Sequence, residues 1–219
     1  MPLATGLALI FDLDGVLVDS NPVHRDAWEV FLRRNGLELT GAMRQRIFGR
    51  RNDEIVRDFF GGLSDAEVFA RGAAKEELYR EMITGRIEEA LVPGVRTFLE
   101  RHRGEPMGVA TNAEPANLKF VLDRAGLRPY FRATVDGHQV VHAKPHPEIY
   151  LRAACLLGAS PQNCIIFEDS FYGIEAARAA GGRVIGVGTT HGDLPGTELT
   201  IDNFLNGDLE PWLDAQRPV

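Results

Sequence analysis

Two aspartates that lie two residues apart, Asp12 and Asp14, directly follow an apolar run in the segment LALIFDLDGVLVD. The run at residues 7–11 is short and rich in Leu and Ile, which is typical of a strand buried on both faces. Side chains two positions apart on a strand point to one face, and Gly15 permits a turn after them. Close carboxylates repel each other, and Mg²⁺ relieves that repulsion while leaving them able to act as nucleophile and general acid/base. Taken alone, the pattern also fits an ordinary strand-end turn, where Asp is common.

The second half of the chain predicts the sheet to which this strand belongs. Apolar runs at 106–110, 133–135, 164–168, 183–187 and near 199–202 alternate with helical patterns at 94–103, 115–125, 147–157 and 172–180. This alternation predicts an α/β fold, a Rossmann-like parallel sheet with helices on both faces. Ligands of such sheets gather outside the carboxyl ends of the strands. At these ends we expect Asp12 and Asp14 to meet Thr111, Asn112, Ala113, Lys144, Glu168 and Asp169.

Acidic, hydroxyl, amide and ammonium groups that converge in this way predict a site for a metal and an anionic ligand. Asp12 is the candidate nucleophile, which attacks phosphorus to form an aspartyl-phosphate, and Asp14 is the candidate general acid/base. Lys144 supplies a fixed positive charge. The candidate Mg²⁺ ligands are Asp12, Asp14, Glu168 and Asp169, with Glu168 bound directly or through water, and Thr111, Asn112 and Ala113 face the phosphoryl group. Each motif alone also has an ordinary explanation as a turn, a helix cap or a solvated loop lysine.

Residues 18–90 show only helical patterns, at 21–35, 52–60 and 64–83, and Pro93-Gly94 marks the return to the core. We therefore predict a core domain of residues 1–17 and 91–219 and an inserted all-helical cap domain of residues 18–90. The third cap helix is expected to bury mainly Val68, Ala74, Leu78 and Met82.

The cap is expected to set the substrate, as lids commonly do. Its candidate substrate-binding residues are Ser20, His24, Trp28, Gly49, Arg50, Arg51, Asn52 and Lys75. His24 and Trp28 share a helix face, where His24 can orient Asp14 or simply pack on the indole. The two arginines can hold a distal anion or form a solvated helix end.

The segment FDLDGVLVDS resembles the first motif of the haloacid dehalogenase superfamily, and of its β-phosphoglucomutase-like phosphatases and mutases in particular. Thr111-Asn112, Lys144-Pro145 and Glu168-Asp169 follow in the family's order. The resemblance implies a haloacid dehalogenase core with a C1-type cap, the same roles for the two aspartates, and a metal bond from the backbone carbonyl of Asp14. Phe48 and Asn52 stand where the mutase has a lysine and a phosphate-clamping arginine. We therefore expect a Mg²⁺-dependent phosphatase of small phosphorylated sugars or metabolites, with β-phosphoglucomutase as the alternative.

Three further classes share parts of this pattern. A haloacid dehalogenase needs neither Asp14 nor Asp169, so both residues count against it. A phosphonate hydrolase of the superfamily needs a cap lysine that forms a Schiff base, and Lys75 leaves this class open. A receiver-type phospho-binding module needs no helical cap of some seventy residues, and release of phosphate from a sugar phosphate would separate an enzyme from it.

The composition narrows the possible partners. The chain has 219 residues and a formal net charge of −7, which argues against non-specific binding to nucleic acid. Cys155 and Cys164 form no disulfide framework, and both are expected to be buried. The sequence shows no secretory signal and no membrane-spanning run, so we expect a cytoplasmic protein. Its acidic surface and small size favour a monomer. The Lys144–Pro145 bond is expected to be trans on base rates.

Overall fold

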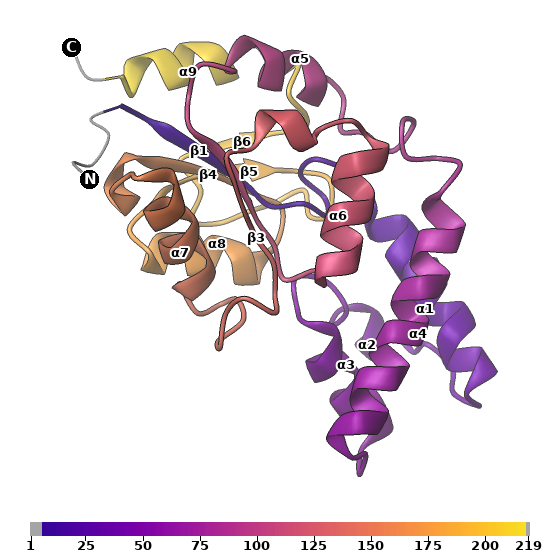
Figure 1. Cartoon of the computed structure of the whole chain (residues 1–219). Coiled ribbons are helices and arrows are strands. Elements are labelled where there is room, and N and C mark those ends of the chain that lie inside the picture. Colours follow the sequence, from indigo (N-terminus) through magenta and orange to yellow (C-terminus); the bar gives the residue numbers. More distant parts are fainter. Residues whose placement is uncertain (1–5, 218–219) are drawn as a thin grey trace.

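A parallel six-stranded sheet forms the centre of the computed structural model, which describes residues 6–217 (Figure 1). The order of the strands across the sheet is β3-β2-β1-β4-β5-β6. Their bounds are β1 Ala8–Phe11, β2 Met107–Ala110, β3 Ala133–Val135, β4 Cys164–Glu168, β5 Arg183–Val187 and β6 Leu199–Ile201. β1 pairs with β2 on one side and with β4 on the other, so the carboxyl ends of these three strands are neighbours. The predicted α/β fold is confirmed, although residues 1–5 and 218–219 of the predicted core lie outside the described residues.

Helices cover both faces of the sheet (Figure 1). α5 (Val95–Arg101), α6 (Pro115–Arg124) and α9 (Leu209–Ala215) pack on one face, and α7 (Glu148–Leu157) and α8 (Phe171–Ala179) pack on the other. β1 shows why its sequence is apolar throughout: Leu9 and Phe11 enter the first core, whereas Ala8 and Ile10 enter the second. Alternate side chains of a strand point to opposite faces, so a strand covered on both sides is apolar at every position.

The cap consists of α1 (Asn21–Arg34), α2 (Gly41–Arg44), α3 (Asn52–Phe60) and α4 (Asp65–Ile83). Pro22 stands in the first turn of α1, and a capping box between Ser64 and Glu67 begins α4. The chain leaves and re-enters the core along adjacent paths, because the amide of Asp19 donates to the carbonyl of Ala90 at 2.7 Å. The division into domains at residues 18 and 90 stays a prediction.

Several local expectations are wrong. Cys155 is exposed, because α7 buries Ala153, Ala154 and Leu157 and turns position 155 outward; Cys164 is buried as expected. The Lys144–Pro145 bond is cis rather than trans.

The sequence patterns also missed the short helices α2 and α9. Of the four residues predicted to be buried on α4, Val68 and Leu78 are buried as expected, but the other two are not. Ala74 is exposed and Met82 is only partly buried, whereas Lys75 and Glu76 are buried, since α4 packs against a polar site. Over residues 6–217, no helix has both the length and the apolar character that a membrane span requires.

Candidate active site

A cavity of about 440 Å³ lies between the carboxyl ends of the strands and the cap helices. Its floor includes Asp12, Thr111 and Asp169, which end or follow β1, β2 and β4. Its roof includes residues of α1 and α4 and the segment 47–53 of the cap. The cavity therefore brings together residues from both predicted domains.

Lys144 joins two of the strand ends. Its Nζ donates to Oδ1 of Asp12 at 3.0 Å and to Oε1 of Glu168 at 2.6 Å. Lys144 and Asp12 are 132 positions apart in the chain, and Lys144 reaches Asp12 from the loop between β3 and α7, whereas Glu168 lies near Asp12 because β1 and β4 are neighbours. All three side chains are almost fully withdrawn from solvent, which strengthens their mutual attraction.

The charges of the floor perturb one another strongly. Burial raises the pKa of Asp12 to about 7, against the opposing charge of Lys144. Burial also raises the pKa of Asp169 well above its usual value, and the carboxylates of Glu168 and Asp12 raise it further. For Lys144, burial works against the charged form, but the two carboxylates beside it raise its pKa overall. The floor thus gathers more negative charge than one ammonium can balance.

The acidic cluster fits a divalent cation. Asp12, Glu168 and Asp169 each offer an oxygen within 4.8 Å of the others, and hard cations such as Mg²⁺ take oxygen ligands. Both oxygens of Glu168 also accept hydrogen bonds from protein donors, among them Tyr150 and the amide of Ser170. Lys144, the amide of Asp169 and the hydroxyl of Ser170 donate to it as well. A carboxylate has about four lone-pair sites, so these five bonds orient Glu168 and occupy its acceptor sites, and the other oxygens of the cluster belong to Asp12 and Asp169.

The structure explains why a glycine, Gly15, follows the two aspartates. Its φ of 81° lies in the left-handed region, and a Cβ at this position would lie 1.9 Å from Oδ2 of Asp169. Only glycine combines that backbone conformation with such a close approach. The turn after β1 is therefore shaped around the acidic cluster.

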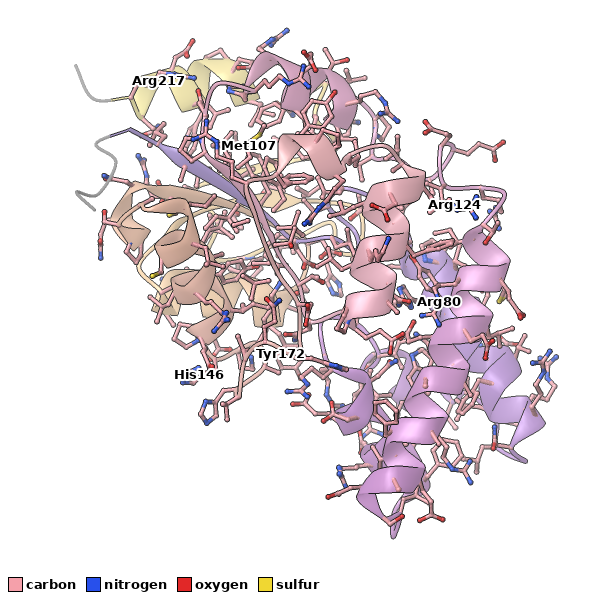
Figure 2. The ribbon with its side chains drawn as sticks, viewed as in Figure 1. Arg80, Met107, Arg124, His146, Tyr172 and Arg217 are labelled. Atoms are coloured by element: carbon pink, nitrogen blue, oxygen red, sulfur yellow. The ribbon has the colours of Figure 1, made fainter. Side chains whose placement is uncertain are left out.

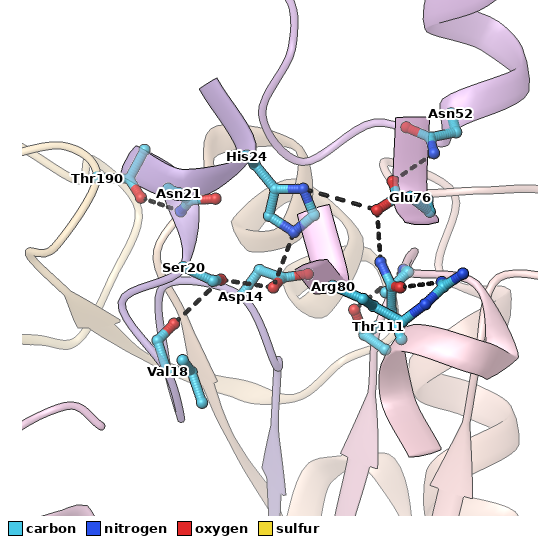
Figure 3. A network of polar contacts seen from close by, with 12 residues as sticks. Asp14, Val18, Ser20, Asn21, His24, Asn52, Glu76, Arg80, Thr111 and Thr190 are labelled. Atoms are coloured by element: carbon cyan, nitrogen blue, oxygen red, sulfur yellow. Dashed lines mark hydrogen bonds and ion pairs between the residues drawn. The ribbon is translucent and has the colours of Figure 1, made fainter. Parts of the chain in front are cut away.

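Asp14 faces the cap rather than the cluster (Figure 3). Its Oδ1 accepts a hydrogen bond of 2.5 Å from Oγ of Ser20 and lies 3.3 Å from Nε2 of His24. Burial opposes ionisation of Asp14, but His24 and Ser20 outweigh it and lower its pKa. The side chain of Asp14 is thus held apart from the three carboxylates of the cluster, in a position suited to proton transfer.

The cap residues near Asp14 form a connected polar network. His24 lies between Asp14 and Glu76, with its Nδ1 3.9 Å from Oε2 of Glu76 (Figure 3). Nζ of Lys75 lies 2.7 Å from the same Nδ1 and 5.1 Å from the centroid of the Trp28 ring. His24 itself stacks on Tyr79, at 3.7 Å between ring centroids, and not on Trp28.

The remaining predicted residues also line the cavity or border it. The carbonyl of Gly49 accepts a 2.8 Å hydrogen bond from Asn112, and the amide of Ala113 donates to Oγ1 of Thr111 at 3.1 Å. Asn52 bonds to Glu76.

The two predicted anion-binding arginines are engaged with carboxylates of the cap. Arg50 lies 3.1 Å from Asp58, and Arg51 lies 3.2 Å from Asp53. Their role in holding a distal anion stays a prediction.

Sequence reasoning missed several polar residues of the site. Asn117 on α6 donates to Glu76 at 2.6 Å, and Arg80 reaches from α4 toward α6 to contact Glu114 at 2.6 Å and Asn117 at 2.7 Å (Figures 2 and 3). Asn21 donates to Asp169 at 2.9 Å. Glu76 had a signal, because it lies in register with the buried positions Val68, Gly72, Tyr79 and Ile83 of α4. A charged residue on a buried helix stripe indicates a polar partner.

A parallel sheet with an acidic cluster at its strand ends, beneath a helical insertion, defines a class of hydrolases. The family model described as "haloacid dehalogenase-like hydrolase" matches residues 7–181. The chain belongs to this family and is an enzyme.

Two curated relatives show how far the similarity extends. The chain is 36% identical over 174 residues to fructose-1-phosphate phosphatase YqaB of Escherichia coli (strain K12), covering 79% of the chain and 92% of the relative. It is 32% identical over 190 residues to β-phosphoglucomutase of Bacillus subtilis (strain 168), covering 83% of each. The solved structure of β-phosphoglucomutase from Clostridium difficile matches with a TM-score of 0.85 and 26% identity, over 97% of this chain and 98% of that one.

Proposed function

We propose that the protein is a Mg²⁺-dependent phosphatase that hydrolyses the phosphomonoester of a small phosphorylated sugar through an aspartyl-phosphate on Asp12. The observation that carries this proposal is the placement of Asp12 between the ammonium of Lys144 and the carboxylates of the acidic cluster. Similarity to a fructose-1-phosphate phosphatase supports the substrate class.

The proposed reaction consists of two half-reactions. In the first, an oxygen of Asp12 forms a bond to phosphorus, the ester P–O bond breaks, and Asp14 gives its proton to the departing alkoxide. The lowered pKa of Asp14 favours its ionised form, which is the form that takes a proton from water in the second half-reaction, so Asp14 must take up a proton before the first. In the second, water attacks phosphorus, Asp14 takes up a proton from this water, and inorganic phosphate leaves with Asp12 restored.

Other groups at the strand ends stabilise the phosphoryl group. Lys144 and Thr111 offer a positive charge and a hydroxyl, and the turn at Asn112 and Ala113 adds donors at the same edge. Held by Asp12, Asp169 and the backbone carbonyl of Asp14, Mg²⁺ would supply the positive charge that offsets repulsion between the carboxylates and the phosphate.

A phosphate-release assay over sugar phosphates and p-nitrophenyl phosphate tests the proposal. We expect turnover with Mg²⁺ and none in Asp12→Asn, with the fold of the variant intact. Full activity in Asp12→Asn would contradict the covalent route.

β-Phosphoglucomutase activity is the second candidate, supported by the similarity to two such enzymes. It differs only in the acceptor, since a sugar hydroxyl rather than water receives the phosphoryl group. Formation of glucose 6-phosphate from β-glucose 1-phosphate with a bisphosphate primer would identify it.

A further inference from the structure

Glu76 is a carboxylate on the cap side of the cavity, opposite the strand ends. It lies on α4, is 4% exposed, and lines the same cavity as Asp12. Burial opposes its ionisation, but Lys75 and His24 outweigh burial and lower its pKa. None of the roles proposed above, nucleophile, general acid/base or cation ligand, falls to Glu76. We therefore ask how the charge of Glu76 affects the binding of a ligand in this cavity.

Glu76 forms an ion pair with the neighbouring residue on α4, Lys75. Its Oε1 accepts from Nζ of Lys75 at 2.8 Å. The same Nζ contacts Nδ1 of His24 at 2.7 Å and lies over the Trp28 ring. An ammonium has three N–H groups, and these two hydrogen bonds use two of them. The charge of Lys75 is thus already balanced by a carboxylate of the cap.

The other cations of the cavity are engaged in the same way. Among the described residues that line it, the Lys and Arg side chains are Arg50, Arg51, Arg57, Lys75 and Lys144, and each contacts a carboxylate. Lys144 lies at the strand ends, where the transferring phosphoryl group is proposed to bind. The cap end therefore offers no unpaired cation within the described lining.

Two carboxamide side chains line the cavity beside Glu76. Asn52 and Asn117 both donate to Glu76, and both line the cavity with His24. Amide groups of this kind pair with hydroxyls without requiring a charge. An ionised carboxylate held among them repels a second anion but accepts hydroxyl donors.

We propose that Glu76 determines specificity by excluding a second anionic group, so that the enzyme selects phosphomonoesters whose remaining part is an uncharged polyol or sugar. This inference rests on the proposed phosphatase function and narrows its substrate class. It also disfavours a cycle through a sugar bisphosphate, since such an intermediate places a second phosphate at the cap. The residue acts on binding of the substrate and takes no part in bond breaking.

Two substrates of matched length test the proposal. A hexitol 6-phosphate and 6-phosphogluconate differ at the far end, where one has a hydroxymethyl group and the other a carboxylate. We expect wild-type kcat/KM to favour the hexitol phosphate by about tenfold or more, the size of a like-charge contact in a partly buried site. Glu76→Gln keeps the shape of the side chain and removes its charge, and we expect it to reduce this ratio about tenfold, chiefly through KM of the charged substrate.

The ratio compares kcat/KM for two substrates of the same protein sample. A smaller folded fraction in a variant lowers both values equally and leaves the ratio unchanged. Glu77→Gln, one position along α4 and exposed, is the matched control and should leave the ratio unchanged. Glu76→Ala removes the same charge in a different shape and should shift the ratio in the same direction as Glu76→Gln.

Each outcome decides the matter. A wild-type ratio near one overturns the proposal without any variant, and an unchanged ratio in both Glu76 variants overturns it as well. If the wild-type protein hydrolyses neither sugar phosphate nor p-nitrophenyl phosphate, the proposed function fails too. Hydrolysis of p-nitrophenyl phosphate with no discrimination between the matched pair overturns the Glu76 proposal alone.

Discussion

Lys144→Met is expected to lower the free energy of unfolding by about 3 kcal/mol. The substitution keeps a long apolar stem and removes the ammonium that lies 3.0 Å from Asp12 and 2.6 Å from Glu168. At an effective dielectric constant of about 20, one unit charge pair at 3.0 Å attracts by about 5 kcal/mol, and breaking a buried pair typically costs about 3–5 kcal/mol. The lower end applies because Asp12, whose pKa is already raised to about 7, can take up a proton when Lys144 is lost.

Urea denaturation in the presence of a chelator measures this loss. Lys119→Met is the matched control, because Lys119 pairs with Asp123 on the exposed surface of α6, where such pairs contribute at most about 1 kcal/mol. Added Mg²⁺ should recover part of the stability lost in Lys144→Met, since a cation at the acidic cluster replaces the missing charge. Equal losses in the two variants would refute the idea that Lys144 balances the buried carboxylates.

The remaining predictions concern the metal, Glu76 and the contact between cap and core. Excess chelator should abolish turnover, and Mg²⁺ but not Ca²⁺ should restore it, because Ca²⁺ prefers longer bonds and more ligands; full activity in chelator would exclude the metal role. The folded-state pKa of Glu76 is lowered from 4.5, so its stabilisation is present above that pH and is lost as pH falls. The stability difference between wild type and Glu76→Gln, measured by thermal melting, should therefore shrink below pH 4.5, and a difference that grows on acidification would contradict this sign. Arg80→Ala removes the bonds from α4 to Glu114 and Asn117 on α6, and should lower stability by about 1–2 kcal/mol and raise KM several-fold. Arg33→Ala, which removes an exposed pair with Glu29, should change neither quantity appreciably.

The strand ends could be predicted because short apolar runs stop at polar residues. In a parallel sheet the ends of neighbouring strands share one edge, so Asp12, Lys144 and Glu168 could be placed together without knowledge of the intervening helices. The cap was predictable only as a set of helices. Its outline follows from local signals such as the Ser64–Glu67 capping box, which depend on residues a few positions apart.

The contacts within the cap site were not predictable, because they depend on how helices from different parts of the chain pack. Glu76 bonds to Asn117, which lies 41 positions away on α6. Arg50 contacts Asp58, although nothing in the sequence favours that pairing over a substrate anion. Val68 and Leu78 of α4 are buried as predicted, but burial of Lys75 and Glu76 was missed for the same reason, since apolar periodicity assumes that a buried face is apolar.

The most direct test of the central claim is a search for the covalent intermediate. The enzyme is mixed with a sugar phosphate and Mg²⁺, quenched in acid within the first turnover, digested and analysed by mass spectrometry. The account predicts one added phosphoryl group on the peptide that contains Asp12, and none on that peptide from Asp12→Asn. Rapid hydrolysis with no phosphorylated peptide, or with the phosphoryl group on another residue, would contradict it.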